Sequence, residues 1–289
     1  MMVTSRRLFT SAPVVRVIAT LAVAMVMAAP VFAQTTRSAF VAALDKDGNA
    51  VADLTAADFD LKIAGKPVPI ASADLTSKKM RIALVIADGG IGAYQRSMAT
   101  VIEKLLGLAE FKIVAVVDQP DMMLDWTTDP EKLVDAVNKL GARKSVKASS
   151  QTIEAINETV KTMAKEGERP VMIVMRLGGE PATSIRAEVV RNAVRNSGTR
   201  LYVISPTGGN QTGLDLGVVL NDVSRESGGH HDQVAQTTAA KVVDALINEL
   251  MTQYELVYTP PADLRPTDKI EVSTKKKGLK LYAPSRMPD

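Results

Sequence analysis

Short apolar runs alternate with longer amphipathic segments between residues 79 and 252, and this alternation constrains the fold most strongly. Apolar runs of about 4–8 residues between Gly- or Asp-containing turns are typical of strands buried in a parallel sheet. They lie at 81–87, 111–117, 170–177 and 200–205, with a shorter edge-strand candidate at 122–126. Helices are predicted at 95–108, 130–140, 153–163, 185–196, 216–227 and 237–252. Right-handed crossovers then give an α/β fold, a doubly wound, mostly parallel sheet with helices on both faces.

Two predicted helix starts carry capping residues. Asp129 precedes Pro130, and Ser149 with Ser150 precedes the segment 153–163. We therefore expect Asp129 and the serine pair to cap the two helices.

Residues 1–33 have the pattern of an export signal that is cleaved after Ala33. Arg6, Arg7 and Arg16 precede the apolar run 17–29, which is short for a span of about 20 residues, so a retained anchor is the less favoured alternative. The segment 5–9 resembles a twin-arginine motif, and both the Sec and twin-arginine routes stay open. We expect a periplasmic or secreted protein with no stable membrane span after signal removal.

Charge and cysteine content exclude several classes of function. Without the three signal arginines, 32 basic residues equal the 32 acidic ones, so the mature chain has no excess charge for nucleic acid. The absence of cysteine excludes disulfides, thiolate metal sites and cysteine nucleophiles. Core packing must stabilise the fold.

Short β segments flank the α/β region. Strands are predicted at 40–44 and 59–63 within an N-terminal β unit, 34–78, and at 254–258, 269–274 and 279–283 within a C-terminal unit, 253–289. The last two strands predict a β-hairpin that packs on the N-terminal unit, beside the central domain 79–252. The turn at 45–49 resembles a calcium loop, but Ala50 and Ala56 replace its glycine and glutamate, which favours a plain turn.

The order of these elements and two local phrases resemble the von Willebrand factor A-related domains of exported bacterial proteins, including the acidobacterial type. The first phrase is Asp45, Gly48, Val51, Leu54, Thr55, Asp58 and Phe59, followed by Gly65-Lys66-Pro67; the second is Ser227-Gly228-Gly229 with the Tyr-x-Leu-x-Tyr strand at 254–258. The resemblance covers most of the mature chain and implies a von Willebrand A or Rossmann-like fold.

This resemblance also implies a metal-ion-dependent adhesion site, formed by Asp-x-Ser-x-Ser after the first strand, a loop Thr and a later Asp. Asp88 keeps the first position, Gly90 and Gly92 replace both hydroxyls, and Leu177 stands near the later Asp. Ser150 could supply the loop hydroxyl, and Glu180 could replace the lost carboxylate. These few donors suit a divalent ion poorly. We therefore expect a vestigial site, with no metal and no cofactor.

Other binding motifs are weak. The Gly-rich turn at 88–92 lacks the Lys-Ser/Thr of a phosphate loop. His230 and His231 should point to opposite faces of an extended segment, which favours an exposed polar start of an edge strand over a metal site. No nucleophile elbow, paired-carboxylate motif or zincin motif is visible.

We therefore expect a non-enzymatic, exported protein-interaction or structural module that acts without an ion on an unidentified envelope protein. Ligands of open α/β sheets bind at the carboxyl ends of the strands. The candidate interaction face comprises Asp88, Gly89, Ile91, Tyr94, Ser149, Ser150, Gly179, Glu180 and Thr207. Two alternatives stay open: a weak metal-dependent adhesion or ligand-binding site at Asp88, and an unrecognised periplasmic hydrolase that uses Asp88, Glu180 and Arg176.

Overall fold

The computed structural model describes residues 36–117, 119–141, 149–181, 183–208, 213–263, 265 and 268–286, with only the backbone at 149–150, 180–181 and 236. The chain divides into two compact units, and the second, Thr36–Asp289, contains all of these residues. The predicted export signal lies outside the described residues. Within them, no helix combines the length and apolarity needed to cross a bilayer.

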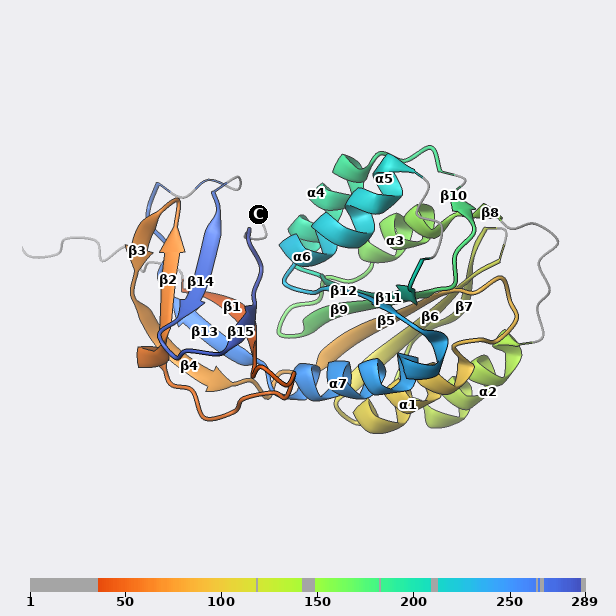
Figure 1. The fold of residues 1–289 in the computed structure, drawn as a ribbon, viewed down its shortest axis with the longest axis horizontal. Helices are drawn as coiled ribbons and strands as arrows, with labels where there is room; N and C mark the ends of the chain where they lie inside the picture. Colours follow the sequence, from red (N-terminus) through yellow and green to blue (C-terminus); the bar gives the residue numbers. More distant parts are fainter. Residues whose placement is uncertain are drawn as a thin grey trace, which may run out of the picture. The chain divides into compact units, whose positions relative to one another are not determined.

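A six-stranded sheet forms the centre of the described α/β region (Figure 1). Its order is β12(His231–Val234), β11(Arg200–Pro206), β9(Arg169–Arg176), β5(Met80–Ala87), β6(Ala109–Val116) and β7(Pro120–Thr127). β5 pairs in parallel with β6 and β9, whereas the edge strand β7 runs antiparallel to β6. The strand order reverses between β5 and β9, so their carboxyl ends border the crevice where ligands of such sheets bind.

Helices cover both faces of this sheet, as predicted (Figure 1). One layer contains α1(Gln95–Leu105), α2(Pro130–Leu140) and α7(Ala239–Met251), which follows the short η3(Gln236–Thr238). The other contains α3(Thr152–Val160), α4(Ala187–Ser197) and a continuous helical run of α5(Leu214–Gly217), the π-helical η2(Val218–Val223) and α6(Ser224–Glu226). Each layer shares an apolar core with one face of the strands. The doubly wound architecture is confirmed.

The two predicted caps have different outcomes. The side chain of Asp129 accepts hydrogen bonds from the amides of Glu131 and Lys132, as expected for an N-cap. The prediction for Ser149 and Ser150 is wrong, because these residues form the short strand β8(Ser149–Ser150), which pairs with β10(Glu180–Pro181). Gln151 precedes α3 without a side-chain cap.

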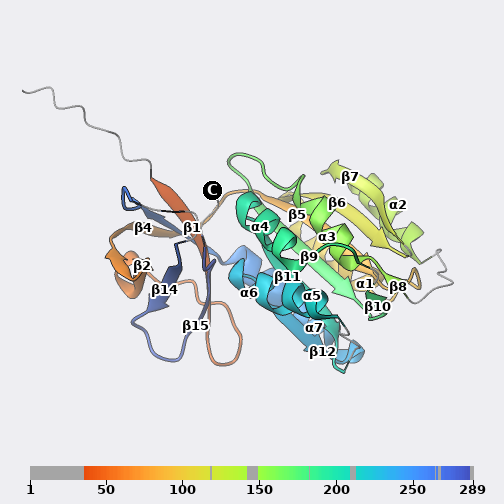
Figure 2. The same ribbon diagram turned by 90° about the horizontal axis from the view of Figure 1, so that it is seen from above.

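Strands from both ends of the unit form two further sheets (Figure 2). The first has the order β15(Lys280–Tyr282), β1(Arg37–Leu44), β13(Tyr254–Tyr258) and β4(Ile70–Leu75). The second has the order β14(Ile270–Thr274), β2(Phe59–Ile63) and β3(Lys66–Val68), with η1(Ala56–Asp58) before β2. Apolar side chains of both sheets share small cores.

The predicted C-terminal hairpin is wrong, although its strands do pair with N-terminal ones. β14 pairs with β2 and β15 pairs with β1, so the two strands lie in different sheets. In this arrangement Ile270 is buried with Leu61 and Ile63 of β2, which a two-stranded hairpin could not provide.

Close packing explains the Ser-Gly-Gly phrase after α6. A Cβ atom on Gly229 would lie 2.1 Å from the carbonyl oxygen of Leu201 in β11, and one on Gly228 would lie 2.6 Å from the Pro284 nitrogen. Ser227 Oγ accepts a hydrogen bond from the Leu201 amide at 2.9 Å. The phrase therefore joins α6 to β11 and to the C-terminal segment.

Candidate functional site at the carboxyl edge of the sheet

The turn after β5 is built around the carboxylate of Asp88. Asp88 is 7% exposed, and its Oδ1 accepts a hydrogen bond from the Gly90 amide at 2.9 Å. Gly90 and Gly92 have φ angles of 78° and 74°, and a Cβ on Gly92 would lie 3.0 Å from the Gly141 Cα. The glycines thus have a structural role in a tight turn. Asp88 does not cap α1, which begins at Gln95.

Tyr94 lies beneath this turn. It is 3% exposed, and its hydroxyl donates a hydrogen bond to the Arg176 carbonyl oxygen at 3.0 Å. Burial, and then the carboxylate of Asp88, raise the pKa of Tyr94 to about 12 against the opposing charge of Arg176. The prediction that Asp88 and Tyr94 belong to a contact surface is therefore wrong. Both side chains are buried and support this edge of the sheet from within the core.

The strand β9 ends at a buried arginine, Arg176, whose carbonyl oxygen accepts the hydrogen bond from Tyr94. Arg176 is 1% exposed and donates from Nη2 to the Gly179 carbonyl oxygen at 2.9 Å, and burial lowers the pKa of its guanidinium. Among the described residues, Arg176 Nε and Asp88 Oδ2 have no hydrogen-bond partner. The edge therefore contains a buried cationic side chain at the end of β9, whose backbone pairs with the residue before Asp88.

The donor set fits a divalent ion poorly. Asp88 offers one carboxylate, half of which is engaged by Gly90, and the side chains of Ser150 and Glu180 are not described. No group of three His, Asp or Glu side chains within the described ranges has metal-ligand geometry.

A second group of hydrogen-bonded polar side chains lies where β11 ends and β12 begins. Ser205 Oγ lies 2.8 Å from His231 Nε2, and His231 Nδ1 lies 2.8 Å from Asn221 Oδ1. Asn221 Nδ2 donates to the Gly217 carbonyl oxygen at 2.8 Å, which fixes Oδ1 as the atom facing His231. His231 Nδ1 must then carry the proton, and Nε2 accepts from the Ser205 hydroxyl. Burial lowers the pKa of His231; the Asp232 carboxylate opposes this effect, and Arg176 and His230 add to it.

His230 points the other way, as expected for adjacent residues on extended backbone. Its Nε2 lies 2.9 Å from Glu249 Oε2 in α7, and its ring contacts those of Tyr202 and Tyr282 at 5.1 and 4.7 Å between centroids. Its side chain is 16% exposed. The prediction of an exposed polar strand start is therefore wrong, although β12 is an edge strand.

The other predicted face residues lie around this edge. Ile91 is 67% exposed, Thr207 is exposed, and Gly89 and Gly179 are half-buried. The pairing of Glu180 with Ser149 brings the backbones of two predicted face segments together. Sequence reasoning missed Ser205 and Asn221; the position of Ser205 at the end of a buried strand, like that of Asp88, is the signal that could have found the serine.

No protein-family model matches the chain, and no curated protein matches it. Among solved structures, the vWF domain of the type V pili tip protein Mfa5 from Porphyromonas gingivalis is similar at TM-score 0.46 and 10% identity over 61% of this chain and 96% of that one. The VWA domain of SpRpn10 is similar at TM-score 0.43 and 11% identity, over 58% of this chain and 94% of that one. The D319A mutant of the PilB minor pilin from Streptococcus sanguinis is similar at TM-score 0.40 and 9% identity over 61% of this chain. The match covers 63% of that protein's length. The sheet order and the two helical layers are those of a doubly wound α/β fold.

Proposed function

We propose that the chain is an exported protein-interaction module that binds an envelope protein through the carboxyl edge of its sheet without a metal ion. One observation carries the proposal: the buried cluster of Asp88, Tyr94 and Arg176. The Asp88 carboxylate is engaged by the Gly90 amide, and the glycine turn offers no hydroxyl ligands. The cluster supports a rigid edge that needs no ion for its order.

Exposed apolar side chains provide contact area on this edge. Ile91, on the turn after β5, is 67% exposed, and Leu214, which begins the helix after β11, is 86% exposed. Isolated apolar residues occur on most surfaces, but these two follow strands at the edge where doubly wound sheets bind ligands. We assign Ile91 as the central contact.

The test compares binding with and without ions. The mature chain captures its partner from an envelope fraction equally in magnesium and in EDTA, and Ile91→Asp weakens capture of the same protein at least tenfold. Val134→Asp is the matched control, because Val134 is 57% exposed on α2. Ion-dependent capture, or a melting temperature raised by several degrees in magnesium, manganese or calcium, contradicts the proposal. Equal loss in both variants contradicts the assignment of Ile91.

A second candidate function is hydrolysis, favoured specifically by the chain Ser205–His231–Asn221. Its tautomers are those of a serine nucleophile with a histidine base, and the lowered pKa of His231 keeps the base neutral. Ser205 is 3% exposed, so the interaction module remains the first proposal. A fluorophosphonate probe decides: attack of Ser205 Oγ on phosphorus would expel fluoride and pass the proton to His231. Labelling lost in Ser205→Ala and His231→Gln supports hydrolysis, and an unlabelled wild type refutes it.

A further inference from the structure

A cavity of about 220 Å³ lies where β1, α4, α6 and the segment after β15 meet. Its lining includes Pro170, the second residue of β9, and Arg200, the first residue of β11. Because both residues lie at the start of their strands, the cavity belongs to the amino-terminal side of the sheet. It is separate from the carboxyl edge proposed above as a contact surface.

Apolar side chains from several segments of the chain form the walls of this cavity. Phe40 of β1, Pro170 of β9 and Pro284 of the C-terminal segment line it and are half-buried. Val194 of α4 and Val223 of η2 also line it and are 2% and 1% exposed. The cavity therefore has an apolar interior, and its half-buried walls leave it open to solvent.

The hydroxyl groups of the lining form hydrogen bonds within the protein. The Oγ of Ser197 donates to a carbonyl oxygen of α4 at 3.0 Å and lies 2.7 Å from Thr199 Oγ1. Ser227 Oγ donates to a carbonyl oxygen of α6 at 2.6 Å, and Ser38 Oγ donates to the Glu255 carboxylate. These groups contribute little hydrogen-bonding capacity to a molecule inside the cavity.

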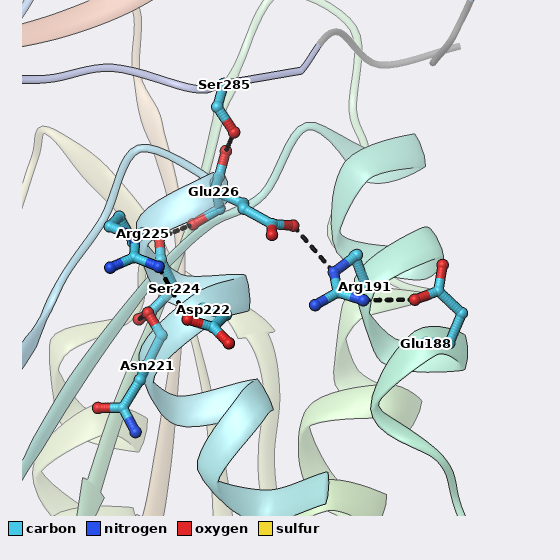
Figure 3. Close-up of polar contacts among 9 residues, drawn as sticks. Glu188, Arg191, Asn221, Asp222, Ser224, Arg225, Glu226 and Ser285 are labelled. Carbon is cyan, nitrogen blue, oxygen red and sulfur yellow. Dashed lines mark hydrogen bonds and ion pairs between the residues drawn. The ribbon is translucent and has the colours of Figure 1, made fainter. Parts of the chain in front are cut away.

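The one carboxylate of the lining is also paired. Glu226 Oε2 lies 2.9 Å from Arg191 Nε, and Arg191 pairs in addition with Glu188 (Figure 3). The backbone of Glu226 is engaged as well, because its carbonyl oxygen accepts hydrogen bonds from the amide and the hydroxyl of Ser285 at 2.9 and 3.2 Å. These two bonds hold the neighbouring Pro284 in place as a wall of the cavity.

The remaining arginines of the lining do not direct donors to a ligand. Arg200 is 4% exposed, its Nη2 donates to two backbone carbonyl oxygens, and its Nε and Nη1 are shielded from solvent. Arg195 Nε donates to Asn196 Oδ1 at 3.4 Å, and Arg286 also interacts within the protein. The positive charges around the cavity therefore provide no positioned partner for an anion.

Water is a poor occupant of such a cavity. A water molecule inside a protein is held by two to four polar partners, and the polar side chains of this lining are engaged with one another or with the backbone. Replacing poorly held water by an apolar group is favourable, because it removes apolar surface from water without breaking a strong hydrogen bond.

We propose that this cavity binds an uncharged apolar molecule of the size of a single hydrocarbon ring, which packs against Phe40, Pro170 and Pro284. The volume limits the ligand to a small molecule. The engaged lining excludes a charged head group, because such a group would lose its hydration without gaining a partner. The Phe40 ring gives an aromatic ligand an additional edge or face contact.

Toluene is the probe, and benzoate and benzylamine are matched ligands that keep the ring and carry a negative or a positive group. Calorimetric titration of the mature chain at constant ionic strength gives saturable toluene binding. Benzoate and benzylamine each bind at least tenfold more weakly. Failure of toluene to bind, or benzoate binding as tight as that of toluene, overturns the proposal.

A substitution and a contact measurement locate the bound ring. Phe40→Ala weakens toluene binding at least fivefold, whereas Leu108→Ala, which truncates an apolar side chain that is 48% exposed outside the cavity, binds like wild type. If Phe40→Ala does not fold, nuclear Overhauser contacts in the wild type decide. Contacts from toluene to the methyl groups of Val194 and Val223 support the proposal, and contacts to Ile91 or Leu214 instead refute it.

Discussion

The protonated imidazole of His230 links three segments of the chain. Raising the pH deprotonates it and removes its charge. Its imidazole lies between Tyr202 of β11 and Tyr282 of β15. Nε2 bonds to Glu249, which is 1% exposed, and Nδ1 lies 2.9 Å from Asp232 Oδ2 in ion-pair range but out of line for a hydrogen bond. Burial alone would lower the pKa of His230, but Asp232 and Glu249 outweigh it and raise the pKa to about 9.

The expected magnitude follows from the two protonation equilibria. The folded-state pKa of about 9 exceeds the unfolded value of about 6.5, so folding binds a proton in this interval. The stabilisation is complete below pH ~6.5 and is lost as the pH rises through ~9. At about 1.4 kcal/mol per pH unit, the free energy of unfolding falls by roughly 3 kcal/mol across the window.

Urea denaturation at intervals between pH 5.5 and 10 measures this decline, and His230→Gln isolates it, because glutamine does not titrate. The difference in unfolding free energy between wild type and His230→Gln should shrink by roughly 3 kcal/mol as the pH rises. His231→Gln is the control: the lowered pKa of His231 places its effect below pH 6.5, where stability is lost as the pH falls. A wild type equally stable at pH 6 and 9.5, or an unchanged decline in His230→Gln, refutes the reasoning.

Three further substitutions test the packing by urea denaturation at pH 7. Tyr94→Phe removes the hydrogen bond to Arg176 and should cost about 1–2 kcal/mol; no loss would show that this bond does not stabilise the edge. Gly229→Ala should cost more than about 3 kcal/mol because its Cβ would overlap the Leu201 carbonyl, whereas Gly217→Ala, with nothing within 4 Å, should be neutral or stabilising; equal effects would contradict the geometry. Asp129→Ala should cost about 1 kcal/mol through the lost N-cap, and an unchanged midpoint would argue against it.

The parts of the fold governed by local pattern were predictable. β5 and β9 are almost wholly apolar; β5 begins one residue earlier than predicted, and β9 both begins and ends one residue earlier. The cap at Asp129 depends on amides two and three residues away, which the sequence displays directly. The end of α1 was predicted too late, because Gly107 with φ 85° permits an earlier turn.

Long-range pairing decided the features that the sequence did not reveal. Ser149 and Ser150 have cap chemistry, yet the partner strand β10 recruits them into a sheet. The turn at 275–278 suggested a hairpin, but apolar faces on β1 and β2 separate its strands. Likewise, the sequence placed Asp88 correctly at the end of a strand, but its burial with Tyr94 and Arg176 depends on the neighbouring strand β9. The surroundings of His230 come from α7 and β15, which are distant in the sequence.

The pairing of β1 also has a consequence for biosynthesis. Arg37 opposes Tyr258, and Leu44 opposes Lys280, so the first described strand waits for partners that are synthesised more than two hundred residues later. The α/β sheet can pair while the ribosome still holds those partners, because its strands all precede β13. Until the final strand emerges, β1 is an open edge able to pair with another chain, and a product truncated before β13 would keep that edge and be prone to aggregate.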